Sequence, residues 1–360
     1  VGEVWPLDDI LERKRLIEAR ALEWSVVESL PVHNDIKLRK GRYREAIEAY
    51  KESIVNLAQA GITTVCYNFM PVVDWTRTNL MYKLPNESYA LSFSMTAFIA
   101  YDIHVLQRNN AASTYTHQQL VAAQRYFDSM TDEQIDQLET NIIAGLPGGS
   151  DAYDRSGIKA AIAEYEQISD SEFRNNLIAF LQDIIPLADK LGVRFCIHPD
   201  DPPFSLFGLP RVVSTASDIR ALLSAVDSRA NGLTLCAGSY GAREDNNLVA
   251  MVKEFGSHIH FAHLRNVKRQ GDGSFFESEH LDGDNDMLGL VEALLDEEHR
   301  RKSLGYKDNQ IPIRPDHGHL MADDIGKKTK PGYSLIGRMK GLSELRGVIF
   351  ALEEVSKRSC

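Results

Sequence analysis

The feature that most constrains the fold is a repeated pairing of a helix-like stretch with a short apolar run. The runs are rich in Val, Ile, Thr and Phe and are bounded by turn residues, which is typical of buried strands. Six such runs occur, at 24–30, 62–70, 193–199, 233–238, 258–264 and 311–315. Because strands alternate with helices, the pattern predicts a parallel sheet covered by helices.

The chain length of 360 residues suits a single α/β barrel. An eight-stranded TIM (β/α)8 barrel needs two strands more than these six runs supply. The additional pair would occupy roughly 30–40 residues, about one βαβ unit. The chain also begins at Val1 without a methionine. We therefore expect one TIM-barrel domain over residues 1–360 that lacks its first two strands.

Residues 71–170 interrupt the alternation of helices and strands. The segment contains helix-like stretches at 117–127 and 131–143. The glycine-rich "GLPGGS" at 145–150 lacks the lysine of a phosphate-binding loop and predicts a turn. No linker of biased composition flanks the segment, which disfavours a separate domain. We interpret 71–170 as an insertion of helices and loops that caps the barrel mouth.

Charge and composition exclude several classes of partner. A formal net charge of −11 argues against nucleic acid or an anionic membrane surface as the main partner. No stretch approaches 18 consecutive apolar residues, and no signal peptide is visible. The four cysteines lack the spacing of a disulfide framework, so a reducing cytoplasm is the expected setting. We expect a small-molecule partner and a homo-oligomer, a dimer.

Metal-ligating side chains close the last four of the six runs. They are His198, Cys236, His263 and Asp316. In parallel α/β folds the C-terminal ends of the strands face the active-site mouth, so these side chains are expected to converge. A single buried Cys or His is more often a core residue. Four on successive strands are not required by core packing, and they indicate a metal site.

The ligand types limit the metal only loosely. Imidazole and carboxylate suit Mn, Fe, Zn or Ni, and thiolate favours softer ions. Open coordination positions would make such a site catalytic rather than structural. Nearby residues of the same types are not expected to join this site, and Cys196 is expected in the core. Cys196 precedes His198 by two residues, and His258 and His260 are out of phase with His263.

Several segments closely resemble the D-mannonate dehydratase family of hexuronate degradation. They are "VCYNFMPVVDWTRT", "HPDDPP", "GLPR", "HLRN", "RPDHGH" and "PGYSLIGRMKGL", and the likeness runs from Gly2 to the C-terminal helix. The resemblance implies a xylose-isomerase-like TIM barrel, Mn²⁺ or Fe²⁺, and an aldonic acid substrate. The implied reaction is the dehydration of D-mannonate to 2-keto-3-deoxy-D-gluconate. The family has two further strands ahead of "GEVWP", which this chain lacks.

The resemblance also assigns roles to particular residues. It implies His198, Cys236, His263 and Asp316 as metal ligands, the set found above from the strand ends. It further implies that His317 and Tyr333 carry out proton transfer. Loss of the C2 proton beside a carboxylate creates a dianionic enediolate, which a divalent cation stabilises. A base must take that proton and an acid must protonate the departing C3 hydroxyl. Which of the two residues acts as the base is left open.

Four polar residues near strand ends are candidates for binding the substrate. Asn68, Arg77 and Arg265 lie just beyond strand ends, and His33 follows the first run. For each one alone, a surface arginine or a loop cap is an equally good interpretation.

Three alternative functions remain open at this stage. The nearest is a metal-dependent sugar isomerase or epimerase on the same barrel, which would form no 2-keto-3-deoxy acid. A catalytically inactive paralogue is disfavoured because His317 and Tyr333 accompany all four ligands. A zinc-dependent nucleic-acid repair barrel is disfavoured by the negative net charge.

Overall fold

A computed structural model describes residues 1–143 and 154–359. The turn predicted at 145–150 therefore lies outside the described residues, as does Cys360. Within the described residues, no helix combines the length and the apolar character that crossing a bilayer requires.

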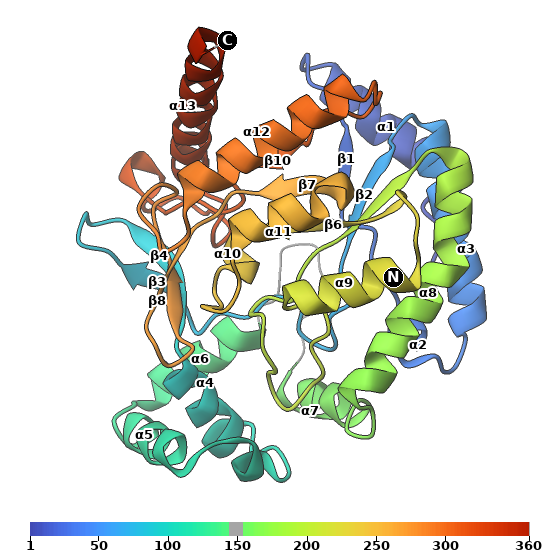
Figure 1. Cartoon of the computed structure of the whole chain (residues 1–360). Helices are drawn as coiled ribbons and strands as arrows, with labels where there is room; N and C mark the ends of the chain where they lie inside the picture. Colours follow the sequence, from blue (N-terminus) through green and yellow to red (C-terminus); the bar gives the residue numbers. More distant parts are fainter. Residues whose placement is uncertain (144–153, 360) are drawn as a thin grey trace.

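Each of the six apolar runs contains one strand of a parallel sheet, as predicted (Figure 1). The strands are β1 Val26–Glu28, β2 Thr64–Tyr67, β5 Arg194–Ile197, β6 Asn231–Cys236, β7 Ile259–His263 and β10 Ile313–Arg314. In the part of the chain that the structure describes, they form one six-stranded sheet in the order β1-β2-β5-β6-β7-β10. Every neighbouring pair is parallel, so the C-terminal ends of all six strands lie at the same edge.

Helices surround this sheet on its outer face (Figure 1). They are α1 Leu7–Glu18, α3 Tyr43–Gln59, α8 Asp170–Leu191, α9 Ala216–Ala225, α11 Leu248–Phe255 and α12 Met287–Ser303. The longest of these, α8, begins with a capping box between Ser169 and Glu172 and ends at Gly192, which has a φ of 68°. Its apolar stripe, which includes Phe173, Leu177 and Phe180, is fully buried against the sheet and α3.

The sheet is curled, so its two edge strands approach each other. Glu28 at the end of β1 forms an ion pair with Arg314 at the end of β10. Inside the curl, the thiol of Cys66 on β2 lies 3.2 Å from the hydroxyl of Thr234 on β6. The curl directs side chains from non-adjacent strands towards a common interior, as the barrel prediction requires.

A second, antiparallel sheet lies beside the first and has the order β3-β4-β9-β8. Its strands are β3 Asn79–Lys83, β4 Tyr89–Phe93, β8 Val267–Arg269 and β9 Phe275–Glu277. The interpretation of 71–170 as helices and loops omitted β3 and β4. Their pairing depends on β9, nearly 200 residues later, and a single short hairpin gives little local signal.

The remainder of the 71–170 segment is mainly helical. Its helices are α4 Met95–Ala100, α5 His117–Asp128, α6 Asp132–Ile143 and α7 Arg155–Ala163, with a π-helical turn at Tyr101–Val105 and a 3-10 turn at Ala111–Thr114. α5 and α6 match the two predicted helices. Short helices α2 Asn34–Leu38 and α10 Ala237–Tyr240 follow β1 and β6, 3-10 turns lie at Gly256–His258 and Ala322–Asp324, and α13 Leu335–Ser359 projects outward at the C-terminus (Figure 1).

Candidate active site

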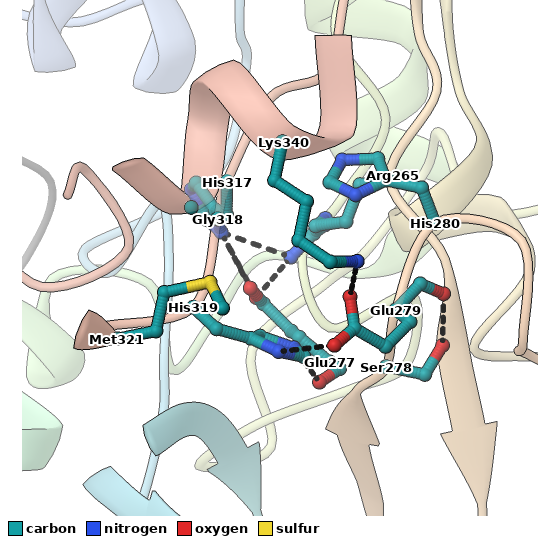
Figure 2. A pocket seen from close by; sticks show the side chains of 11 residues that line it. Arg265, Glu277, Ser278, Glu279, His280, His317, Gly318, His319, Met321 and Lys340 are labelled. Atoms are coloured by element: carbon teal, nitrogen blue, oxygen red, sulfur yellow. Dashed lines mark hydrogen bonds and ion pairs between the residues drawn. The ribbon is translucent and has the colours of Figure 1, made fainter. Parts of the chain in front are cut away.

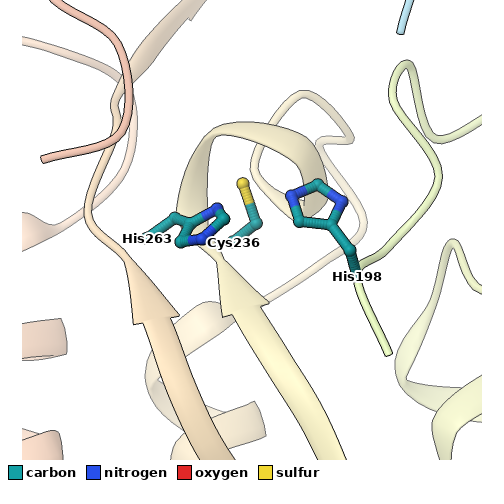
Figure 3. Close-up of side chains that lie close together, drawn as sticks. All are labelled: His198, Cys236 and His263. Atoms are coloured by element: carbon teal, nitrogen blue, oxygen red, sulfur yellow. The ribbon is translucent and has the colours of Figure 1, made fainter. Parts of the chain in front are cut away.

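Three predicted metal ligands converge at the C-terminal edge of the parallel sheet. His198 directly follows β5, while Cys236 and His263 end β6 and β7 and pair with each other in register. Ligand atoms of the three side chains all lie within 4.8 Å of one another (Figure 3). The convergence follows from the parallel pairing, which places the ends of successive strands side by side.

Asp316 lies next to this group but is not among the residues whose ligand atoms all lie within 4.8 Å of one another. One carboxylate oxygen is 3.8 Å from Nδ1 of His263 and the other is 3.9 Å from Sγ of Cys236. Asp316 has a φ of 65°, a left-handed conformation that Asp tolerates better than most residues. Because the backbone turns there, the side chains of Asp316 and His317 both face the same cavity.

The group of His198, Cys236 and His263 fits a divalent transition metal. Both ring nitrogens of His263 are buried without a hydrogen-bond partner of good geometry, which is costly unless something else binds them. Nδ1 of His198 lies 2.7 Å from the carbonyl oxygen of Pro199, an arrangement typical of a metal-ligating histidine whose other nitrogen is free.

The electrostatics of the group also favour a bound cation. Burial raises the pKa of the Cys236 thiol, but Arg265 and His198 outweigh burial and hold the pKa well below its ordinary value. Burial lowers the pKa of His263, but the carboxylates of Glu28 and Asp316 outweigh it and raise the pKa to about 10. Negative charge thus surrounds His263, and a thiolate is the form in which Cys binds metals.

A cavity of about 720 Å³ opens beside His198 and Asp316. That volume lies within the range of roughly 300–1,000 Å³ typical of small-molecule sites. Six of the predicted site residues line it, namely His33, Asn68, His198, Asp316, His317 and Tyr333. Three residues of the 71–170 segment, Val72, Asp74 and Trp75, also line it.

His317 is held by a carboxylate that the sequence analysis did not identify. Nδ1 of His317 lies 2.9 Å from each carboxylate oxygen of Glu277, at the end of β9 (Figure 2). Burial raises the pKa of Glu277, but His317, Arg265 and Arg77 outweigh it and lower the pKa to about 2. An ionised Glu277 accepts a hydrogen bond from Nδ1–H, which leaves Nε2 of His317 for the cavity.

Tyr333 lies beside His317 at the cavity wall. The two rings are 5.3 Å apart between centroids, and the backbone of Tyr333 pairs with Gly318. The phenol oxygen is 3.5 Å from Nη2 of Arg314. Burial, reinforced by Asp316, raises the pKa of Tyr333, so the phenol keeps its proton near neutral pH.

The structure does not bring Arg77 or Arg265 into the cavity lining. Both are fully buried behind it, where they bind Asp201 and Glu277. Arg77 lies 2.8 Å from Asp201, and Arg265 lies 2.6 Å from the same carboxylate. The alternative interpretation, that each is a surface arginine, is therefore wrong for both. Their guanidinium groups instead hold the carboxylate that orients His317.

The cysteine and the two histidines that were not expected to join the site lie apart from it, as predicted. Cys196 is buried in a small apolar cluster with Cys66 and Phe261. Ring nitrogens of His258 and His260 lie at hydrogen-bond distance from the carbonyl oxygens of Asn231 and Arg229. Both histidines therefore contact backbone carbonyls and do not join the group of His198, Cys236 and His263.

Glu28 is a second carboxylate at the candidate site that was not predicted from the sequence. It ends β1, lines the cavity and lies 3.2 Å from Nε2 of His263. The rule applied to the last four strands would have found it, because Glu28 closes its own apolar run. Glu277 offered no comparable signal, since it ends a strand of the second sheet.

Comparisons with known proteins agree on one family. The family model described as D-mannonate dehydratase (UxuA) matches residues 1–359. A mannonate dehydratase of Saccharophagus degradans is 61% identical over 358 residues, 99% of this chain and 90% of the relative. Mannonate dehydratase 2 of Agrobacterium fabrum is 55% identical over 357 residues, 99% of this chain and 90% of the relative. The crystal structure of mannonate dehydratase from Streptococcus suis serotype 2 matches with a TM-score of 0.76 and 34% identity, over 99% of this chain and 84% of that one.

Proposed function

The chain belongs to the D-mannonate dehydratase family, and from that premise we propose how its own residues dehydrate D-mannonate to 2-keto-3-deoxy-D-gluconate. One observation carries the proposal. His317 and Tyr333 lie side by side in the wall of a cavity that His198 and Asp316 also line. Proton-transfer groups and metal-ligating groups thus face the same space.

We propose that His198, Cys236, His263 and Asp316 hold a divalent cation, Mn²⁺ or Fe²⁺. When bound, such a cation would act as a Lewis acid that stabilises the negative charge developing on the substrate as C2 loses its proton. The ring nitrogens of His263, which have no hydrogen-bond partner of good geometry, and the low pKa of Cys236 support the ligand set. Glu28 would orient His263 through Nε2, as outer carboxylates do at many metal sites.

His317 serves as the base in this proposal. Glu277 accepts a hydrogen bond from Nδ1–H and so directs the lone pair of Nε2 towards the cavity. Nε2 takes the proton from C2, and the imidazolium that forms is stabilised by the buried carboxylate of Glu277. Arg77 and Arg265 keep that carboxylate ionised and in position.

Tyr333 serves as the acid. Its raised pKa keeps the phenol protonated, and Arg314 lies close enough to stabilise the phenolate that remains. The C3–O bond breaks as Tyr333 protonates the departing hydroxyl, which leaves as water. The resulting enol converts to the 2-keto-3-deoxy acid, so the net change is the loss of one water molecule.

The cavity wall supplies polar partners for the rest of the substrate. Asn68 and His33 line it and are proposed to bind substrate hydroxyl groups. Nδ1 of His33 already accepts a hydrogen bond from the backbone of Asp35, which leaves Nε2 for the substrate. We propose that the 71–170 segment caps the cavity through Asp74 and Trp75 and limits the access of water.

Three further expectations from the sequence concern the type of barrel, the oligomeric state and the cellular location. The curled parallel sheet supports a TIM barrel of the xylose-isomerase-like kind, which a crystal structure tests. A homodimer and a cytoplasmic location are proposed from the sequence alone. Analytical ultracentrifugation and cell fractionation test these two.

The function is tested by incubating the purified chain with D-mannonate and Mn²⁺ and identifying the product by mass and by its α-keto group. The proposal expects a 2-keto-3-deoxy acid that is lighter than the substrate by one water molecule, and no product after chelation of the metal. A product of unchanged mass would identify an isomerase or epimerase and overturn the proposal.

A further inference from the structure

Lys37 is a buried cation in the wall of the active-site cavity. It belongs to α2, the short helix that follows β1, and its side chain is mostly shielded from solvent, with 8% of the residue exposed. Nζ donates a hydrogen bond to the carbonyl oxygen of Met70, 2.7 Å away. Lys37, Met70, Asn68 and Asp74 all line the cavity. The ammonium group is therefore fixed at the cavity from a helix outside the parallel sheet.

The charge of Lys37 is less compensated than that of the other cationic side chain in the lining. Arg314 also lines the cavity, and its guanidinium forms ion pairs with both Glu28 and Asp316. Among the residues that the structure describes, Lys37 has no carboxylate within the 4 Å that defines an ion pair, and Arg211 adds positive charge nearby. Burial lowers the pKa of Lys37 to about 8, although Asp74 partly opposes the shift. A buried cation without a paired anion is costly, which favours an anionic ligand.

On the basis of the proposed function, we propose that Lys37 binds the carboxylate of the aldonic acid substrate. The substrate is an anion near neutral pH, because carboxylic acids have pKa values of roughly 4. A lysine ammonium has three N–H donors, and Met70 accepts one of them, so two remain for a carboxylate. The cavity lining otherwise offers that carboxylate mainly like charge, from Glu28, Asp74 and Asp201.

This assignment separates two tasks within the cavity. Lys37 neutralises the charge that the substrate carboxylate carries from the start, and the ligand group around His198 stabilises most of the second charge, which spreads onto the same carboxylate as the enediolate forms. The part of the contact that is already present in the ground state lowers KM, and the part that strengthens as the enediolate forms raises kcat. Lys37 is therefore a determinant of specificity for acids over neutral sugars and polyols, and it takes no part in proton transfer.

The test compares Lys37→Met and Lys37→Gln with wild type, all loaded with Mn²⁺. Met keeps nearly the length of the side chain without its charge, and Gln keeps an uncharged N–H donor. Lys40→Met is the matched control, because Lys40 lies three residues away, is exposed and pairs with Glu164. Thermal melting and Mn²⁺ content establish that each variant is folded and loaded.

We expect both Lys37 variants to raise KM for D-mannonate by about 10- to 100-fold, the range typical of a lost charge-assisted hydrogen bond. kcat should fall by a smaller factor than KM rises, Lys37→Arg should recover most of the affinity, and Lys40→Met should behave as wild type. A folded Lys37→Gln with wild-type KM, or with a loss confined to kcat, would overturn the assignment. If wild type itself fails to dehydrate D-mannonate, the proposed function fails first, and that result is distinguishable from a failure of Lys37 alone.

Discussion

Nδ1 of His317 lies 2.9 Å from both carboxylate oxygens of Glu277, and the two residues come from different parts of the fold. His317 follows the last strand of the parallel sheet, whereas Glu277 ends β9 of the antiparallel sheet. The second sheet therefore does more than extend the molecule at one side. It delivers the carboxylate that fixes the ring and the tautomer of the proposed base.

Replacing Glu277 with Gln should lower kcat for D-mannonate by about 10²-fold, because a neutral partner stabilises the imidazolium of His317 less well. KM and Mn²⁺ content should remain close to wild type, since Glu277 lies outside the cavity lining. Steady-state kinetics and metal analysis measure all three quantities. Glu279→Gln is the matched control. Glu279 lies two residues after Glu277 and pairs with His319 and Lys340 instead of His317. An equal loss in both variants would indicate a general structural effect.

Tyr333→Phe should reduce kcat by roughly 10²- to 10⁴-fold, the usual contribution of one positioned proton-transfer group. The variant loses only the hydroxyl, and the ring keeps its contact with His317, so its thermal stability should stay near wild type. Tyr82→Phe, in the antiparallel sheet, serves as the control. Wild-type kcat in Tyr333→Phe would mean that another group protonates the leaving hydroxyl.

Glu28→Gln should weaken Mn²⁺ binding by about 10- to 100-fold, which is the usual effect of losing an outer carboxylate at a metal site. The carboxylate lies 3.2 Å from Nε2 of His263, and its loss also removes the ion pair with Arg314. Titration of the metal-free protein with Mn²⁺, followed by electron paramagnetic resonance, gives the dissociation constant. The exposed Glu23→Gln is expected to leave it unchanged. Equal affinity in wild type and Glu28→Gln would remove Glu28 from the metal site.

Phe180→Ala should lower the free energy of unfolding by about 3–5 kcal/mol, because it leaves a cavity in a well-packed core. Phe180 is fully buried on α8, and its ring contacts those of Tyr50, Tyr67 and Phe69. Urea denaturation followed by circular dichroism measures the change. Phe350→Ala, on the exposed face of α13, should shift stability by no more than about 0.5 kcal/mol. A similar small shift for Phe180→Ala would show that this aromatic cluster does not support the sheet.

The parallel sheet could be predicted because each strand is a short apolar run bounded by turn residues. The alternation of these runs with helices indicates that neighbouring strands are parallel. The same reasoning predicts that His198, Cys236 and His263 converge, since parallel strands end at one edge. Glu28 could have been predicted in the same way, because it ends the first strand of the parallel sheet.

The rest of the site depends on contacts between distant parts of the sequence. Arg77 and Glu277 are 200 residues apart, and their ion pair forms only after the two sheets pack together. Their residue types alone are equally consistent with a solvated surface, so no local pattern predicts a buried charge network. The strands β3 and β4 were missed for a related reason, because β4 pairs with the distant strand β9.

The role of His317 as the base is tested by comparing Mn²⁺-loaded wild type with His317→Asn, with D-mannonate turnover and bound Mn²⁺ measured on the same samples. We predict that wild type forms the 2-keto-3-deoxy acid and that His317→Asn retains its Mn²⁺ while its rate falls by at least about 10²-fold. A fully loaded His317→Asn that dehydrates D-mannonate at a rate close to wild type would show that His317 is not the base.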